Sequence, residues 1–499
     1  MLGRIVSNFQ MQARLMQLRS CMAERSMASL SRPRPLVPDP TLLLFLMAGL
    51  LVWAPLVTDE MTRIVLICVA VLPLGLWLFT WLASSAEAGI ALLVVASAIP
   101  RGSVDIGGVN VRPEHLAVAL LCLALPLLLK RRPQQAVTWI YADYILAAYV
   151  GLNILSSLMV SPSPPQTLKS AMQQMLAILP YFFLRVLADD QRKLRWAFRA
   201  FLVVGALAAA YGVLAYYSNF LFGTEFGVEV EQYVTMPATY GTQFEANILG
   251  AYCGAFSVAM LAMYVQEKRR SYLVGYAITM TGMAVSLSRG ALGATFIGMV
   301  VLAYYARKMG LLNGQVLRAV ALATLCMAMI SVPVLAPRYA ERLRTLDVAD
   351  PTADSNTLFR FVQFAAAVDD FVASPILGNG TASFQLLFSE KDAAIVGTET
   401  PWIANAELRV LHDTGVVGFA VFVLFVVALV RQARRRLKHL SDPMLLALLV
   451  SAVVYVVSFQ VTEGTILAFT WVHLGLMGCA MTLATSGNRD QRGGEQLLR

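Results

Sequence analysis

Long apolar runs separated by short polar segments make up most of this 499-residue chain. Because a membrane-spanning helix needs roughly 17–25 apolar residues, the pattern predicts about 12–14 spans. The fold class that follows is all-α, a polytopic transmembrane helix bundle. The predicted spans are residues 41–57, 62–82, 86–100, 113–129, 139–160, 166–187, 196–218, 246–265, 271–288, 290–306, 316–335, 413–430, 443–461 and 464–485.

Basic residues gather in alternate loops of this arrangement. Lys and Arg favour the cytoplasmic loops of membrane proteins. The sequence therefore predicts that the N- and C-termini are cytoplasmic. The loops placed inside contain "KRRPQQ" (130–135), "DDQRKLR" (189–195), "QEKRR" (266–270), "ARK" (306–308) and "RQARRRLKH" (431–439).

The longest segment outside the predicted spans, residues 336–412, is expected to be a large outer loop that contains short helices. Residues 355–374 carry apolar positions at helical spacing, and the glycine-rich "PILGNG" (375–380) follows them. The other predicted segments are a basic cytoplasmic tail (1–40), N-terminal transmembrane helices (41–218), central transmembrane helices (219–335), C-terminal transmembrane helices (413–485) and a second cytoplasmic tail (486–499).

Composition agrees with a membrane protein and excludes several kinds of chemistry. Only 14% of the residues are charged, whereas soluble domains carry about 25%. The net charge of +9 is explained by the inner loops, so no nucleic-acid partner is expected. The six cysteines show no CxxC spacing, and the chain has no Walker loop, HExxH or GxSxG motif. We expect neither a metal nor a cofactor.

One charge interrupts a long apolar run, in "SLSRGALGA" (286–294). Residues 271–306 would extend about 54 Å as a single helix at ~1.5 Å per residue. A hydrocarbon core is ~30 Å thick, so the run should form two spans. Ser288-Arg289-Gly290 is then predicted to be a tight turn at the outer surface, and Gly290 suits such a turn because glycine tolerates a positive φ.

Further arginines are expected on the same outer side, notably Arg360 and Arg409. The planar guanidinium binds phosphate oxygens in a bidentate manner. Arg289 and Arg360 are therefore candidates for binding a lipid diphosphate. Three others are expected to be headgroup or salt-bridge residues: Arg338, Arg342 and Arg344.

Polar residues share one predicted helix face in "PWIANAELRVLHDTGVVGFAVF" (401–422). Asn405, Arg409 and His412 are spaced i, i+4, i+7. His412 could act as a base near neutral pH, or it could cap the end of the span together with Asp413. Other candidate bases are the nearby carboxylates Glu399, Glu407 and Asp413.

A second polar segment, "ATYGTQFEANILGAY" (238–252), opens the predicted span at 246–265. Gln243 and Asn247 could offer amide contacts to a sugar. The alternative is that this segment is an ordinary polar start of a span.

Four of these segments together resemble the O-antigen ligase and O-antigen polymerase family of multi-spanning glycosyltransferases. The resemblance covers roughly residues 235–430, and the four segments stand in the order of the family. They are "GTQFEANILGAY" (241–252), "SLSRGALGA" (286–294), "RFVQFAAAVDDFVASPILGNGTASF" (360–384) and "NAELRVLHDTGVVGFAVF" (405–422).

The resemblance implies a GT-C-type enzyme in the plasma (inner) membrane of a bacterium. Such an enzyme moves glycan from an undecaprenyl-diphosphate-linked donor to a saccharide acceptor at the outer face, without a metal. Arg289 and Arg360 would bind the donor diphosphate, Gln243, Asn247 and Asn405 would contact glycan, and His412, Glu407 and Arg409 would serve catalysis.

The chain departs from the family at one position. Members often carry a histidine immediately before the asparagine of the fourth segment, and here that residue is Ala404. The acceptor-activating role of that histidine therefore does not transfer. His412, a carboxylate, or stabilisation of the leaving group alone would have to replace it.

The expected function is that of a polymerase joining lipid-linked repeat units of an O-antigen or exopolysaccharide. One alternative is a ligase that moves finished glycan to a lipid A-core or another acceptor. An alternative of another class is a transporter or flippase of lipid-linked oligosaccharide. Other polysaccharide-assembly proteins are candidate partners, besides the bilayer itself.

Overall fold

The computed structural model divides the chain into two compact units, Met1–Trp81 and Leu82–Arg499. Within the first unit it describes only residues 75 and 77–81, which are helical, and the fold below is that of the second unit. The residues described in the second unit are 82–106, 109–130, 137–230, 237–344, 355–388, 402–439 and 442–483.

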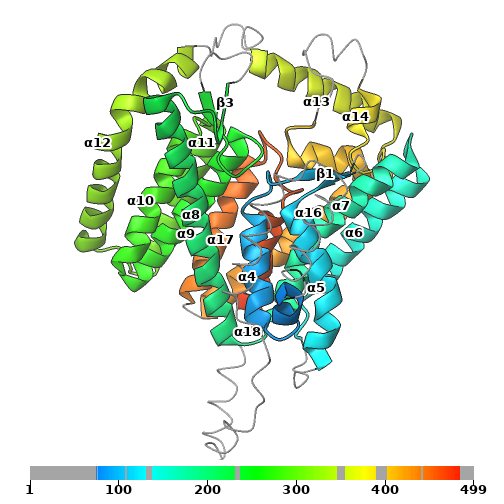
Figure 1. The fold of residues 1–499 in the computed structure, drawn as a ribbon, viewed down its shortest axis with the longest axis horizontal. Coiled ribbons are helices and arrows are strands. Elements are labelled where there is room, and N and C mark those ends of the chain that lie inside the picture. The colour runs from blue at the N-terminus through cyan, green and yellow to red at the C-terminus, as the bar shows by residue number, and fades with distance from the viewer. Residues whose placement is uncertain are drawn as a thin grey trace, which may run out of the picture. The chain divides into compact units, whose positions relative to one another are not determined.

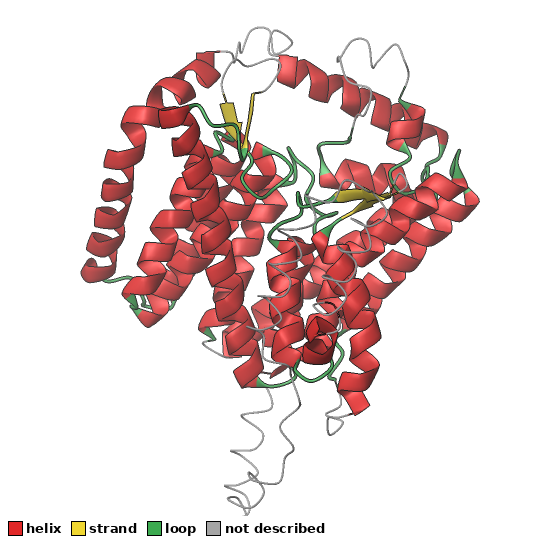
Figure 2. Cartoon of the chain, viewed as in Figure 1, coloured by secondary structure: helices red, strands yellow, loops and turns green. Residues whose placement is uncertain are grey.

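The second unit is a bundle of helices with two small β-hairpins (Figures 1 and 2). The hairpins are antiparallel: β1 (Val104–Ile106) with β2 (Val109–Val111), and β3 (Val228–Val230) with β4 (Pro237–Thr239). The helices are α4 (Ala86–Ser97), α5 (Pro113–Lys130), α6 (Tyr141–Met159), α7 (Pro164–Leu187), α8 (Gln191–Phe222), α9 (Ala246–Glu267), α10 (Arg270–Val285), α11 (Arg289–Lys308), α12 (Gly314–Arg344), α13 (Ser355–Ala373), α14 (Phe384–Leu387), α16 (Ala406–His439), α17 (Pro443–Ser458) and α18 (Ala468–Leu483).

The prediction of an all-α polytopic bundle is confirmed. Among the described residues, seven helices are long and apolar enough to cross a membrane, or eight if the bent pair within α12 is one span. Three shorter helices, α4, α17 and α18, are also apolar. The chain is therefore a multi-pass membrane protein.

Each predicted span between residues 86 and 485 coincides with one helix, although several helices end elsewhere than expected. Helix α12 continues past residue 335 to Arg344 and bends by 69° between Met329 and Ser331. Arg338, Arg342 and Arg344 therefore lie on a helix and not in a loop. The predicted spans 41–57 and 62–82 lie wholly or mostly outside the described residues.

Both hairpins and α13 lie at the same end of the bundle (Figure 2). We call this end the loop face, and contacts described below join its segments to one another. These segments are 98–106, 109–112, 223–230, 237–245, 286–289, 355–388, 402–405 and 459–467.

Helix α9 forms the centre of the bundle and is buried along nearly its whole length. Its glycines let α11 approach closely: a Cβ at Gly250 would lie 2.7 Å from that of Ala291, and one at Gly254 would lie 2.1 Å from Thr295 Oγ1. Small residues commonly allow such close helix crossings in membranes. The crossing brings the first residues of α9 and α11 together at the loop face.

Candidate functional site

The start of α11 is fixed by a serine that is bonded to α9. Ser288 Oγ accepts from the backbone N–H of Ala291, at 3.3 Å, and donates to Asn247 Oδ1 at 2.8 Å. Arg289 is the first residue of α11 and is half-buried. Asn247 and Arg289, which were predicted as glycan- and diphosphate-binding residues, thus belong to neighbouring helix starts.

The turn before α11 differs from the predicted one. The left-handed conformation belongs to Leu287, with φ 55°, whereas Gly290 lies inside the helix. The turn therefore lies one to two residues earlier than predicted, and Gly290 does not adopt the positive φ that it tolerates. Its missing side chain serves packing, because a Cβ there would lie 2.5 Å from Val461 Cγ2.

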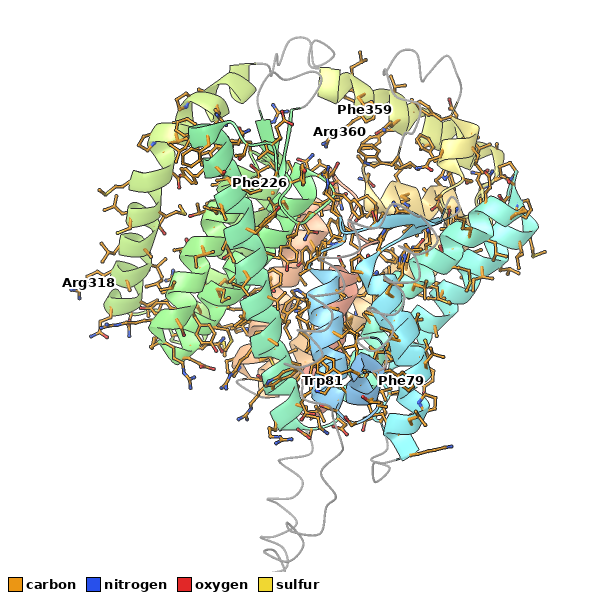
Figure 3. All side chains as sticks on the ribbon, in the orientation of Figure 1. Phe79, Trp81, Phe226, Arg318, Phe359 and Arg360 are labelled. Carbon is orange, nitrogen blue, oxygen red and sulfur yellow. The ribbon has the colours of Figure 1, made fainter. Side chains whose placement is uncertain are left out.

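Arg360 lies on α13, half-buried and turned toward the bundle (Figure 3). Arg289 and Arg360 therefore both belong to the loop face, although they come from segments far apart in the sequence. A helix start carries partial positive charge, which adds to that of the guanidinium of Arg289.

Two further arginines of the loop face were missed by the sequence analysis. Arg101 donates to the backbone oxygen of Phe244 at 3.1 Å, and its guanidinium carbon lies 3.3 Å from the centre of the Tyr240 ring. Arg112 donates to Ile466 O at 3.1 Å. Both lie at the ends of a loop that the predicted topology places outside, where arginine is scarce. Their unusual position in that loop could have identified them from the sequence.

The residues at the start of α16 bind the loop between α17 and α18. Asn405 caps α16 by accepting from the N–H of Leu408 at 2.8 Å, and its amide donates to Gln460 O at 3.1 Å. Glu407 Oε1 accepts from the Gln460 amide at 2.6 Å. Asn405 and Glu407 are half-buried.

Arg409 is held between two buried carboxylates. Its Nε lies 3.5 Å from Asp413 Oδ2 and its Nη1 lies 3.4 Å from Glu463 Oε1. The side chain of Arg409 is 13% exposed, and each carboxylate side chain is 4% exposed. Arg409 thus neutralises its neighbours and presents little surface to a diphosphate.

His412 is fully buried, and both of its ring nitrogens face carboxylates. Nδ1 lies 2.9 Å from Asp413 Oδ1, and Nε2 lies 3.3 Å from Asp370 Oδ2 of α13. The Phe384 ring meets the imidazole edge-on. In this arrangement no nitrogen of His412 is available to an incoming hydroxyl, and the residue ties α13 to α16.

The glycine-rich segment after α13 fits into a break in α16. Gly415 interrupts the helix with φ 63° and ψ −169°, and the N–H of Val416 donates to Pro375 O at 2.9 Å. A Cβ at Gly415 would lie 2.2 Å from Ile376 O, and one at Gly378 would lie 2.5 Å from Gly415 N. Two backbones therefore touch where only glycine fits.

Gln243, a predicted glycan contact, is fully buried. Its amide donates to Ala98 O, at the end of α4, at 3.2 Å. Gln243 thus holds the segment before α9 against α4.

The loop between α17 and α18 comprises residues 459–467, whereas the sequence predicts a break of only two residues between these spans. It contains Glu463, the only acidic residue between Asp442 and Asp490. Thr462 donates to Glu245, just before α9, and Glu463 Oε1 accepts from Thr465 N at 2.7 Å. Burial raises the pKa of Glu463 above its ordinary value, and the Arg409 charge and the Thr465 hydrogen bonds offset part of that rise.

No group of three or more His, Cys, Asp or Glu in the described part of the chain is placed to hold a metal ion. Compared with protein-family models and with curated proteins, the chain matches none of them. The site therefore has to be interpreted from its own residues: arginines and helix starts on one face, beside a buried cluster of carboxylates around Arg409.

Proposed function

We propose that the chain is a polymerase-type membrane glycosyltransferase that joins undecaprenyl-diphosphate-linked repeat units at the outer face of a bacterial plasma membrane. The main support for this proposal is the position of Arg289. It begins α11 beside Asn247, and Arg360 lies on the same face. Positive charge there suits a diphosphate at headgroup level.

In glycosyl transfer, the positive charge of Arg289 would stabilise the departing diphosphate. The glycosidic bond between the donor sugar and the diphosphate breaks, and undecaprenyl diphosphate leaves with the electron pair while the acceptor hydroxyl attacks. Negative charge grows on the diphosphate during this step. A guanidinium already oriented toward it stabilises the transition state more than the ground state.

The resemblance supports the proposal through the way its segments meet. The first and second segments are joined by the Asn247–Ser288 hydrogen bond, and the third and fourth by the contacts of His412 and Gly415. Residues far apart in the sequence thus contribute to one face.

The glycan profile of a strain lacking this protein tests the proposal, resolved by size and by lipid carrier. Single repeat units accumulating on the carrier at the outer face would support a polymerase. Full-length chains on the carrier would instead identify a ligase. Repeat units that stay inaccessible to an externally added glycosidase would indicate a flippase.

A further inference from the structure

Glycosyl transfer to a hydroxyl leaves one proton to be accepted, and the candidates from the sequence are poorly placed for it. Both nitrogens of His412 face carboxylates. Asp413 is also occupied: Oδ1 is close to His412, and Oδ2 accepts from the N–H of Ala382 at 3.0 Å and contacts Arg409. Glu399 lies outside the described residues.

Glu463 offers a different geometry. Oε1 is fixed by Thr465 and Arg409, whereas Oε2 is buried and has no hydrogen-bond partner among the described residues. A buried acceptor without a donor is unfavourable. A hydroxyl arriving at Oε2 would remove that penalty.

The loop that carries Glu463 also touches the proposed donor side. Thr462 is bonded to Glu245, at the start of α9, and Val461 packs on Gly290, next to Arg289. Glu463 therefore lies within two residues of contacts to both helix starts. Glu407 Oε2 is likewise buried without a hydrogen-bond partner among the described residues, and Glu407 contacts this loop at Gln460, so Glu407→Gln is the matched comparison.

We propose that Glu463 accepts the proton of the acceptor hydroxyl, and that Arg409 positions its carboxylate. This inference rests on the proposed glycosyl transfer. The acceptor O–H bond breaks, its proton goes to Glu463 Oε2, and its oxygen forms the new bond to the donor sugar. Undecaprenyl diphosphate leaves with the electron pair of the old bond, so that no other reactant is needed.

The surroundings of Glu463 shift the pKa of its carboxylate upward. Its charged or titratable neighbours are Arg409 and Asp413 from α16 and Tyr149 from α6. Burial disfavours the carboxylate and raises its pKa, while Arg409 keeps the ionised form accessible. A general base is most effective when its pKa lies near the working pH.

The test is the pH–rate profile of the purified full-length protein, with undecaprenyl-diphosphate-linked repeat units as donor and acceptor. A base must be deprotonated, so the rate of the wild type should fall as the pH drops through its pKa. Glu463→Gln keeps the shape of the side chain. Glu463→Gln should lower the rate by about 10²–10⁴-fold. It should also remove the acidic limb of the profile, that is, the fall in rate at low pH.

Matched variants exclude a merely structural role. Glu114→Gln changes another buried carboxylate beside an arginine, 3.6 Å from Arg112, and should keep the acidic limb. If Glu463→Gln retains the acidic limb, the inference is overturned. It is also overturned if the acidic limb is lost in Glu407→Gln or in Glu114→Gln.

If Glu463→Gln does not accumulate in the membrane, the pH–rate profile of Glu463→Asp is measured instead, because this variant keeps the negative charge facing Arg409. A shifted limb at reduced rate supports the inference, whereas wild-type rate and limb overturn it. If the wild type transfers no glycan at all, the proposed function fails, and not the choice of base.

Discussion

Arg289 combines two sources of positive charge at one point of the loop face. It begins α11, where the helix dipole adds partial positive charge, and Ser288 fixes that start through Asn247. A charge in an apolar run costs roughly 2.5–3.5 kcal/mol to insert at the bilayer centre. Its position at a helix start, away from the middle of a span, explains how the chain tolerates it.

Replacing Arg289 with Ala should lower glycan transfer by at least about 100-fold, the usual loss for one stabilising group at a developing anion. Arg289→Lys should restore only part of it, because an ammonium lacks the planar fork. Transfer assays normalised to membrane abundance measure both effects. Arg307→Ala, at the other end of the same helix and exposed, is the control; equal activity of Arg289→Ala and Arg307→Ala would contradict the role.

The sequence identifies candidate functional residues that interrupt apolar runs. It does not identify those whose role depends on tertiary contacts. Arg289 stands out because its neighbours are apolar. Glu463 was overlooked because a short loop between two spans carries no local pattern. The surroundings of His412 could not be predicted either, since Asp370 lies 42 residues earlier in the chain.

Helix α16 has a form that depends on another segment of the chain. Its helix breaks at Gly415, and the N–H groups of Val416 and Asn379 bond across to Pro375 O and His412 O, both at 2.9 Å. These bonds replace helical ones, as they must where water is scarce. The break and His412 together hold α13 over the bundle.

Gly415→Ala should destabilise the protein by about 3 kcal/mol or more, because it adds a Cβ against backbone at a φ that L side chains rarely adopt. Thermal unfolding in detergent measures the change. Gly151→Ala in α6 is the control, since a Cβ there meets nothing within 4 Å, and it should be neutral or stabilising by up to about 1 kcal/mol. Equal melting temperatures for the two variants would refute this account of the break.

Helices were the most predictable elements, because the length of an apolar run and the polar segments that bound it are local properties of the sequence. The break within α16 was not predicted, since an isolated glycine in a span is compatible with a continuous helix. Its non-helical conformation follows only from the approach of Gly378.

Over the second unit as a whole, both ends contain buried ion pairs. At the end away from the loop face, a buried pair joins α6 and α7: Arg185 Nη2 lies 3.1 Å from Asp143 Oδ2, and Tyr181 donates to the same carboxylate at 2.5 Å. This pair is satisfied internally and serves packing. Arg289 and Arg360, both half-buried, lie at the loop face.

The predicted orientation places the loop face outside the cell. A cysteine introduced at Ala365, exposed on α13, should react with a membrane-impermeant maleimide in intact cells. A cysteine at Arg434, exposed near the other end of α16, should react only after the membrane is permeabilised. The opposite pattern of labelling would reverse the orientation and remove the outer-face reaction.

The central claim is that this face breaks the bond between glycan and lipid diphosphate. The most direct measurement incubates purified wild-type protein with undecaprenyl-diphosphate-linked repeat units and follows both products, longer glycan and released undecaprenyl diphosphate. One undecaprenyl diphosphate should be released for each glycosidic bond formed, and Arg289→Ala should lower both by at least about 100-fold. A donor that stays intact in the presence of folded wild-type protein would contradict this reaction.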